Sequence, residues 1–448
     1  MKKPLICALV AAIAATGTIT IVATKDDRPV LKVANWAEYI DMGDDEEGTK
    51  PLYEEFEKWY KKKTGKEIRV EYCIADDNET LYNMIKMGDH FDLICPSEYM
   101  IMKLAAEGRL QKLPESFYDT DNPDNYYAKY VSPYISSVFE NNYIKDDPWS
   151  EYAAGYMWGT TGFVYNPELV NEADMTSWNV FTNPAYKKKT TAKNNIRDTY
   201  FVGLAMYYEE QLKALKSQYT GGTLSFAEYQ TELSRLMNDT DEKTMSGVKK
   251  VLKSITDNLY GFETDEGKND MIAGKITVNY QWSGDAVYIM DVAEGFYEEE
   301  EVENPVKLNY AIPDTVSNLW FDGWVIPKDC ENVEAATAFI NFLSMPENAV
   351  RNMNYIGYTS CIAGETVFED YVLDCYEANE DETDIIEYDL SYYFGEGYAL
   401  TAPAEQAYRQ LFAQYPTEET LARCVAMQYF DRDANTRANL MWSDITFF

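Results

Sequence analysis

Histidine is almost absent from this sequence of 448 residues, which contains only His90. A metal site built from several histidines is therefore excluded, and a Ser-His-Asp hydrolase would depend on that single residue. His90 lies in the segment 88–92, which we interpret as a surface turn before a strand. The sequence also lacks a P-loop, a Cys-x-x-Cys pair and a His-Glu-x-x-His motif. We therefore expect neither a metal nor a cofactor.

Basic residues are scarce, with 39 Lys and Arg against 76 Asp and Glu, which gives a net charge of −37. A phosphate-rich partner would be repelled by this excess of acid, so we expect no nucleic acid partner. The same charge keeps a secreted surface soluble, and it would also steer a cationic ligand toward the protein. The charge is consistent with a cationic ligand without requiring one.

Long apolar runs are absent after the N-terminus. Residues 1–28 combine two early lysines, an apolar run over 4–23 and the charged end Lys25–Arg28. This pattern is typical of an export signal, and the run approaches the roughly 20 residues that span a bilayer. We expect residues 1–28 to be a signal peptide or an N-terminal membrane anchor. The remainder would be an exported body, periplasmic or at the cell surface.

Cysteines are few, and outside the cytoplasm they are able to pair. The six that follow the N-terminal segment are Cys73, Cys95, Cys330, Cys361, Cys375 and Cys424. Cys73 and Cys95 end two apparent strands, where they are also interpreted as small buried apolar residues. Spacing alone does not fix a pairing, so both interpretations stay open.

What the sequence does contain is an α/β pattern long enough for two lobes. The expected elements are a strand leading into Trp36–Tyr39, a helix between Pro51 and Gly65, a strand at 68–72, a helix from Asn78 to Gly88, a strand at 91–95 and a helix that stops at Gly108. Alternating strands and helices with short connections predict a mostly parallel sheet covered on both faces.

The regular alternation of strands and helices ends after Gly108. Residues 114–150 are rich in Asn, Asp, Tyr and Pro, which predicts a long surface excursion. Further strands are expected at 156–159, 162–166, 276–282, 308–312 and 319–327, and helical stripes at 201–215, 226–236, 248–259 and 335–343. We expect Asp285 to cap the helix that follows the strand at 276–282.

Two groups of residues stand out chemically. Trp36, Glu38 and Tyr39 follow the first strand, at the sheet edge where open α/β sheets place their ligands, and they suit an organic cation. The alternative is an aromatic core strand with a solvated glutamate. Asp322 lies between Trp320 and Trp324, and if it is buried its carboxylate needs a ligand or a Lys or Arg partner.

Five segments in the same order resemble the spermidine/putrescine-binding proteins of bacterial polyamine ABC importers. They are Asn35–Tyr39, Pro96–Tyr99, Trp282–Asp285, Trp320–Asp322 and Ile356–Tyr358. The resemblance covers most of residues 31–365 and is weaker over 366–448. The chain departs from shorter members at 114–150, at 199–275 and in its tail. Membership would imply an α/β type II periplasmic-binding-protein fold, with two lobes hinged around a ligand cleft.

The resemblance also implies lobe boundaries. The N-terminal lobe would comprise residues 29–158 and 320–365, and the C-terminal lobe residues 159–319 and 366–448. Aromatic residues would surround the methylene chain of the ligand, namely Trp36, Tyr39, Trp282 and Trp320. Ser97, Tyr99 and Tyr358 would lie beside them. The ammonium groups would meet Glu38, Asp198, Asp285 and Asp322.

One position departs from the family pattern. Where spermidine-binding members have an acidic residue three positions before the equivalent of Asp198, this chain has Asn195. We therefore predict that putrescine binds at least as tightly as spermidine. The alternative is that Asn195 only caps the helix carrying Asp198.

The leading hypothesis is a monomeric, non-catalytic binding protein that delivers a polyamine to the membrane permease of an ABC importer. A secreted carbohydrate-active enzyme is the alternative from another class, since acidic pairs beside tryptophans also describe sugar clefts. Within the binding class, the alternative is another cationic or sugar-like solute.

Overall fold

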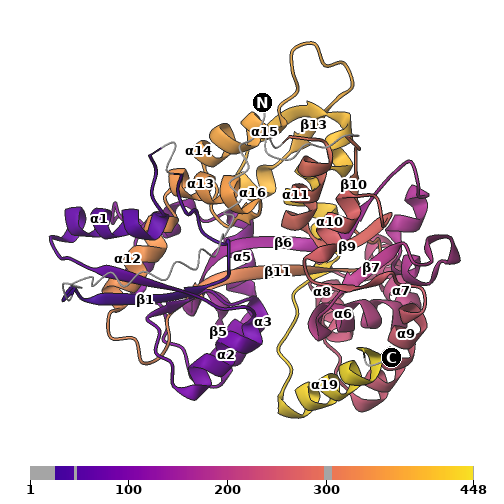
Figure 1. Ribbon diagram of the computed structural model, residues 1–448, viewed down its shortest axis with the longest axis horizontal. Coiled ribbons are helices and arrows are strands. Elements are labelled where there is room, and N and C mark those ends of the chain that lie inside the picture. Colours follow the sequence, from indigo (N-terminus) through magenta and orange to yellow (C-terminus); the bar gives the residue numbers. More distant parts are fainter. Residues whose placement is uncertain (1–25, 45–47, 297–304, 447–448) are drawn as a thin grey trace, which may run out of the picture.

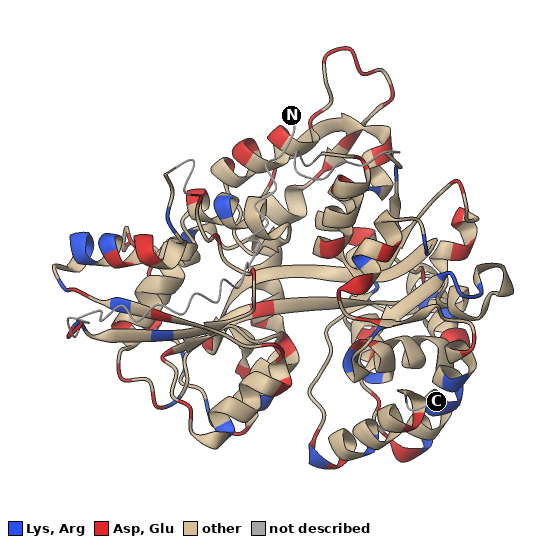
Figure 2. Cartoon of the chain, in the orientation of Figure 1, with Lys and Arg blue, Asp and Glu red and all other residues tan. Residues whose placement is uncertain are grey.

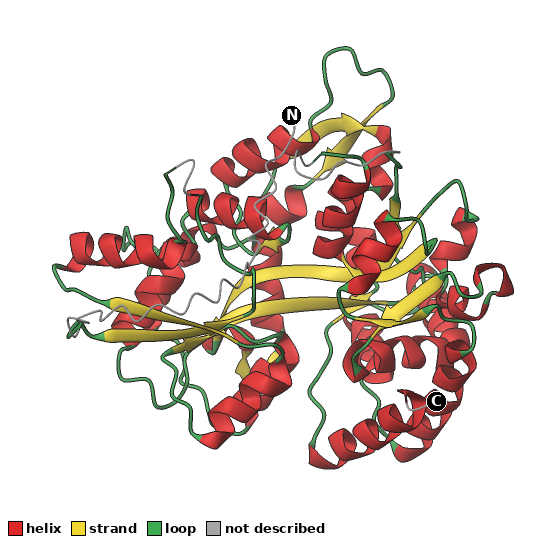
Figure 3. Ribbon diagram, in the orientation of Figure 1, coloured by secondary structure: helices red, strands yellow, loops and turns green. Residues whose placement is uncertain are grey.

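The computed structural model describes residues 26–44, 48–296 and 305–446. Helices gather at two ends of the molecule, and two long strands, β6 (Ala153–Tyr165) and β11 (Ser317–Val325), run between these ends through the middle (Figures 1 and 3). The apolar run over 4–23 that is expected to direct export lies outside the described residues. No described helix is long and apolar enough to cross a bilayer.

A single mixed sheet joins the two ends, in the strand order β2-β1-β3-β11-β6-β9-β7-β8. The other strands of this path are β1 Val30–Asn35, β2 Arg69–Ile74, β3 Leu93–Ile94, β7 Thr190–Lys193, β8 Gly261–Glu263 and β9 Val278–Trp282. β1 pairs in parallel with β2 and β3, and β7 pairs in parallel with β8 and β9. β6 and β11 pair antiparallel to each other.

Helices of the N-terminal lobe follow the sequence pattern closely. They are α1 Leu52–Thr64, α2 Asn78–Met87, α3 Glu98–Ala106 and α12 Val333–Leu343. α1 ends at Gly65, which has a φ of 73° and donates its backbone N–H to the Lys61 carbonyl. A left-handed residue at this position favours glycine, so the expected stop is confirmed. α2 is capped by Asp77, whose carboxylate accepts the N–H of Thr80.

The C-terminal lobe packs its helices around β7, β8 and β9. They are α6 Ile196–Tyr207, α7 Glu209–Thr220, α8 Phe226–Met237, α9 Glu242–Thr256, α10 Glu266–Ile272 and α11 Ser283–Ala293. The apolar stripe expected over 201–215 is divided between α6 and α7, which meet at Tyr208. Helical periodicity alone did not reveal this break, because both helices turn their apolar residues toward the same core.

The strands that cross between the lobes differ from expectation. The separate strands predicted at 156–159 and 162–166 form one strand, β6, which is buried along its whole length. The predicted lobe boundaries at 158/159 and 319/320 fall inside β6 and β11 and stay a prediction. In β11 the register with β6 shifts between Asp322 and Gly323.

The surface excursion predicted at 114–150 is wrong. The segment forms α4 (Tyr126–Tyr130), α5 (Pro133–Asn141) and a hairpin of β4 (Tyr143–Ile144) and β5 (Asp147–Pro148). It buries six large apolar side chains, namely Phe117, Tyr127, Ile135, Phe139, Ile144 and Trp149. These buried residues lie in short elements separated by polar residues. The hydrophobic periodicity in the sequence is therefore too short to predict the elements.

Beyond residue 345 the chain adds a layer above the sheet (Figure 1). This layer includes α13 Pro346–Ile356, β13 Ile385–Asp389, α16 Ser391–Phe394, β14 Ala399–Pro403 and α17 Gln410–Gln414. After it, β15 (Cys424–Val425) pairs with β11, and α19 (Arg432–Thr446) packs on the other side of the sheet beside α9. Buried residues from Val367 to Cys424 join one core cluster, which contains residues of β1 and β3 and also of α11, whereas those from Val425 to Ile445 join a second cluster with residues of α6, α7, α8 and α9. The assignment of residues 366–448 to the C-terminal lobe stays a prediction.

The described cysteines are all free thiols, and Cys95, Cys330, Cys361 and Cys424 are buried. The interpretation of Cys95 as a buried apolar residue agrees with the structure, whereas Cys73 is only half-buried. His90 is exposed, with Nδ1 3.1 Å from Asp329 Oδ2, as expected of a surface residue. Acidic residues are spread over both lobes (Figure 2). The excess of negative charge is therefore a property of the whole molecule.

Candidate ligand-binding cleft

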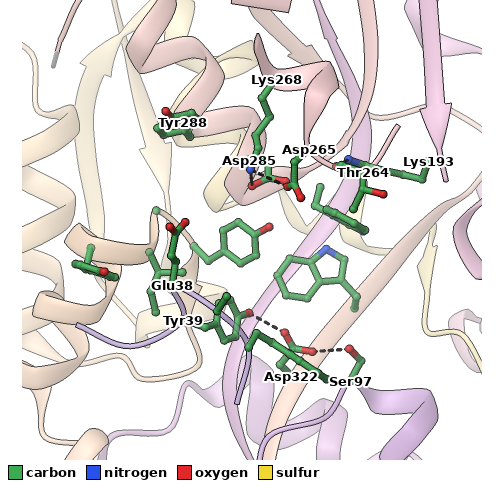
Figure 4. Close-up of a pocket in the computed structure, with 18 of the residues that line it drawn as sticks. Glu38, Tyr39, Ser97, Lys193, Thr264, Asp265, Lys268, Asp285, Tyr288 and Asp322 are labelled. Carbon is green, nitrogen blue, oxygen red and sulfur yellow. Dashed lines mark hydrogen bonds and ion pairs between the residues drawn. The ribbon is translucent and has the colours of Figure 1, made fainter. Parts of the chain in front are cut away.

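A cleft of about 1610 Å³ lies between the lobes, and every residue predicted for the site lines it. The two lobes contribute opposite walls (Figure 4). The N-terminal lobe contributes Trp36, Glu38, Tyr39, Ser97 and Tyr99. The C-terminal lobe contributes Asp198, Trp282 and Asp285. β11 contributes Trp320 and Asp322. Tyr358 follows Gly357, the glycine that ends α13. Their contact with a ligand stays a prediction.

The first strand ends before the aromatic pair, so Trp36–Tyr39 form a turn. Glu38 has a φ of 53° and is exposed. A non-glycine residue in the left-handed region persists only where its surroundings hold it there. Tyr39 supplies that support, because its carbonyl accepts hydrogen bonds from Asn35 Nδ2 at 3.1 Å and from the Tyr156 hydroxyl at 2.8 Å.

Asp322 is buried at one end of the cleft, with 6% of its surface exposed. Its two oxygens accept hydrogen bonds from the hydroxyls of Tyr39 and Ser97, each at 2.7 Å (Figure 4). Burial raises the pKa of Asp322 to about 6, and these hydrogen bonds oppose the rise. No Lys or Arg among the described residues forms an ion pair with it. The carboxylate therefore has hydroxyl partners but no counter-cation.

Two residues that the sequence did not single out organise this end. Asn78, at the start of α2, donates from Nδ2 to Ser97 Oγ at 2.9 Å and accepts the Ser97 N–H at 2.9 Å. Because Ser97 Oγ accepts a hydrogen bond from Asn78, the Ser97 hydroxyl is oriented to donate its hydrogen to Asp322. Glu98 is 2% exposed, and burial raises its pKa to about 8. Its Oε2 accepts the Phe321 N–H at 3.2 Å, so it supports the strand that carries Asp322.

Asp285 marks the other end of the cleft. The prediction that it caps α11 is wrong, because the helix begins at Ser283 and its N-cap, Trp282, makes no side-chain capping bond. The carboxylate instead faces Lys268, with 3.4 Å between Asp285 Oδ1 and Lys268 Nζ. Lys268 Nζ also lies 3.1 Å from Asp265 Oδ1.

Aromatic rings connect these two ends. The Tyr358 ring makes an edge contact with Tyr39, with 5.7 Å between centroids, and lies 5.3 Å from the Trp320 ring. Gly284 permits this position, because a Cβ there would lie 1.4 Å from Tyr358 Cδ1. Burial, then the nearby Asp285 and Asp322, raise the pKa of Tyr358. Its hydroxyl therefore stays protonated beside the cleft.

The remaining wall is built around α6. Asn195 caps this helix, accepting the Asp198 N–H at 2.8 Å and donating to Asp198 Oδ2 at 2.5 Å. The capping role considered for Asn195 is therefore present. Burial raises the pKa of Asp198, which is 5% exposed. Lys193 Nζ lies 4.1 Å from the centroid of the Trp282 ring.

Resident cations are the feature that sequence reasoning missed. Lys193, Lys268 and Arg197 all line the cleft, and the Arg197 guanidinium stacks 4.4 Å from the Tyr99 ring centroid. Isolated basic residues in helices and strands carry no sequence signal that separates them from surface residues. Within the described ranges, no group of three or more His, Cys, Asp or Glu residues is placed to hold a metal ion.

Known proteins with similar sequences have binding functions. The chain is 27% identical over 342 residues to the spermidine/putrescine-binding periplasmic protein of Escherichia coli K12, covering 75% of this chain and 78% of that protein. It is 28% identical over 346 residues to the putrescine-binding periplasmic protein SpuD of Pseudomonas aeruginosa, covering 75% and 79%.

Solved structures agree over a larger part of the chain. A putative spermidine/putrescine ABC transporter protein from Listeria monocytogenes matches with a TM-score of 0.63 at 24% identity, covering 94% of this chain and 99% of that one. The substrate-binding protein PotD of Streptococcus pneumoniae matches with a TM-score of 0.59 at 25% identity, with the same coverage. The expected α/β type II periplasmic-binding-protein fold is confirmed. Residues 52–366, more than half of the chain, match the model of bacterial extracellular solute-binding proteins, and the chain therefore belongs to that family.

Proposed function

We propose that this protein captures a polyamine outside the cytoplasm and delivers it to the membrane permease of an ABC importer. The observation that carries the proposal is Asp322, a buried carboxylate that has hydroxyl donors but no Lys or Arg counter-ion among the described residues. A buried charge without a counter-ion is costly, and a ligand ammonium group would remove that cost.

The surroundings of Asp322 suit an alkyl amine. Trp36, Tyr39, Trp320 and Tyr358 all line the cleft near this end, and their ring faces attract ammonium groups and cover methylene groups. Glu38 extends the acidic lining to the exposed rim. The polyamine-binding names of the relatives from Escherichia coli and Pseudomonas aeruginosa support the same ligand class.

The remaining features of the proposal follow from this role. A solute-binding protein holds its ligand without chemical conversion, so the protein is a carrier and not an enzyme. It acts as a monomer, exported to the periplasm or the cell surface, with residues 1–28 as its signal peptide or anchor. The relatives named as periplasmic binding proteins support this location.

Thermal unfolding tests the proposal. A ligand that binds only the folded state stabilises it by RT ln(1 + [L]/Kd), so putrescine and spermidine should raise the melting temperature. Amino acids, monosaccharides and oligosaccharides serve as comparison ligands in the same buffer. A shift with sugars but with neither polyamine at millimolar concentration would contradict the proposal and favour the carbohydrate alternative.

A further inference from the structure

Lys268 places a cationic group in the cleft beside two carboxylates and an aromatic ring. Its Nζ lies 3.1 Å from Asp265 Oδ1, 3.4 Å from Asp285 Oδ1 and 5.9 Å from the centroid of the Tyr288 ring. Figure 4 shows Lys268 reaching from its helix toward the two carboxylates. An ammonium group between two acids and near an aromatic face is the arrangement expected for a bound amine. Here the protein supplies that amine itself.

We propose that Lys268 is a specificity-determining residue that occupies Asp285 and disfavours a ligand ammonium group at that end of the cleft. The inference rests on the proposed function, because it concerns how the cleft distinguishes one amine from another. The consequence is that the cleft recognises one ammonium group strongly, at Asp322, and discriminates against a second or third.

The two lysines of this wall differ in their freedom to move. The Lys193 side chain is 1% exposed and fixed by Glu263 Oε1 at 3.3 Å, by the Thr264 carbonyl at 3.0 Å and by the Trp282 ring. The Lys268 side chain is 24% exposed, and its partner Asp265 is 70% exposed. Lys268 is therefore able to leave Asp285 and keep Asp265, while Lys193 is held in place.

This freedom makes Asp285 a site of competition. A ligand ammonium group gains Asp285 only by displacing Lys268, or else it binds beside a like charge, which is unfavourable. Burial lowers the pKa of Lys268, but Asp285 and Asp265 outweigh that effect and hold it above its ordinary value. Lys268 therefore stays charged at neutral pH and competes throughout the physiological range.

Two ligands of nearly the same size measure the contribution of the second ammonium group. Putrescine and 4-amino-1-butanol differ only in whether one end carries an ammonium or a hydroxyl group. The ratio of their dissociation constants cancels the contribution of Asp322 and of the methylene chain. In the wild type we expect putrescine to bind less than about tenfold more tightly, the size of one charge-assisted hydrogen bond at its lower limit.

The Lys268→Met variant frees Asp285. We expect it to raise the ratio in favour of putrescine by about tenfold or more. Lys268→Arg keeps the charge and should keep the wild-type ratio. Lys275→Met is the matched control, because Lys275 pairs with Asp270 at 2.6 Å and neither residue lines the cleft. It should leave the ratio unchanged.

A double variant shows whether the effect acts through Asp285. In Lys268→Met/Asp285→Asn the ratio should return to the wild-type value, because the freed carboxylate is gone. A ratio that Lys268→Met leaves within twofold of the wild type would overturn the inference, and so would a raised ratio that Asp285→Asn does not reverse. If neither amine binds the wild type, the proposed function fails and the inference fails with it. If both amines bind and the ratio of their dissociation constants is the same in the wild type and in Lys268→Met, only the inference fails.

Discussion

The two ends of the cleft each present a carboxylate, but they differ in what surrounds it. Asp322 is buried, accepts hydrogen bonds from Tyr39 and Ser97, and has its pKa raised to about 6. Asp285 is more exposed, with 13% of its side chain accessible, and faces Lys268. The comparison teaches that two carboxylates in one cleft differ in whether the protein already supplies a cation, and the proposed binding of an ammonium group at Asp322 depends on that difference.

The largest expected effect is the loss of Asp322. A charge-assisted hydrogen bond contributes about 1.5 to 3 kcal/mol, so Asp322→Asn should weaken polyamine binding by about 10- to 150-fold. Asp285→Asn removes a carboxylate that Lys268 already neutralises and should cost much less. Calorimetric titration of both variants measures the difference. Equal losses at the two positions would break the comparison.

The unliganded Asp322→Asn variant serves as a folding control. The pKa of Asp322 rises from 3.8 to about 6 on folding, so the folded state holds a proton that the unfolded chain has released between these values. Stability due to this group therefore falls as pH rises from about 4 to 6 and stays lower above pH 6. Removing the carboxylate should leave the melting temperature at pH 7.5 unchanged or higher. A large decrease would mean that weaker binding reflects misfolding.

The ring of Tyr358 connects the two ends, and Gly284→Ala tests that connection. The new Cβ would lie 1.4 Å from Tyr358 Cδ1, so the ring has to move. We expect a loss of about 1 to 3 kcal/mol in unfolding free energy, as for other overpacked sites, and weaker binding of putrescine. Gly261→Ala is the control, since a Cβ there meets nothing within 4 Å. Urea denaturation separates the two, and similar stabilities would contradict the contact.

pH sharpens the comparison because burial shifts the pKa of Asp322 toward neutrality. An ammonium group favours the ionised carboxylate, so binding is nearly constant above about pH 7 and weakens as pH falls through about 6. At pH 5, one unit below the pKa, about a tenth of the free protein is ionised there, and affinity should fall about tenfold. Titrations at pH 5 and pH 7 measure this change. The Glu98→Gln variant should retain the pH dependence of the affinity, and Asp322→Asn should lose it. If the affinity of Asp322→Asn still depends on pH, another group is responsible.

The smallest effect is expected at Asn195. In Asn195→Asp a second carboxylate would lie beside Asp198, and two such groups favour one shared proton. We still expect the preference to move toward spermidine, but by less than tenfold, about 1.4 kcal/mol. Competition calorimetry with putrescine and spermidine, performed on the wild type and on Asn195→Asp, measures the change in preference. A wild type that prefers spermidine tenfold, with no change in the variant, would contradict our prediction that putrescine binds at least as tightly.

Much of the N-terminal lobe could be predicted from the sequence because its signals are local. Gly65 ends α1 where a left-handed residue is required, and strands and helices alternate with short connections. The position of Trp36, Glu38 and Tyr39 after the first strand suggested a site at the sheet edge. The resemblance of the five segments to polyamine-binding proteins added the other aromatic and acidic residues to it. The sequence determined which carboxylates and rings are available to a ligand.

Only the tertiary structure decided the partners of those carboxylates. Ser283 begins α11 two residues before the cap expected at Asp285, and this leaves the carboxylate facing α10 and Lys268. Asn78 reaches Ser97 from α2, and Tyr39 reaches Asp322 across 283 positions of sequence. Contacts between distant segments depend on the packing of whole elements, which no local pattern encodes. For that reason the sequence determined the chemistry of the cleft, and the fold determined that Asp322 lacks a counter-cation among the described residues while Asp285 has one.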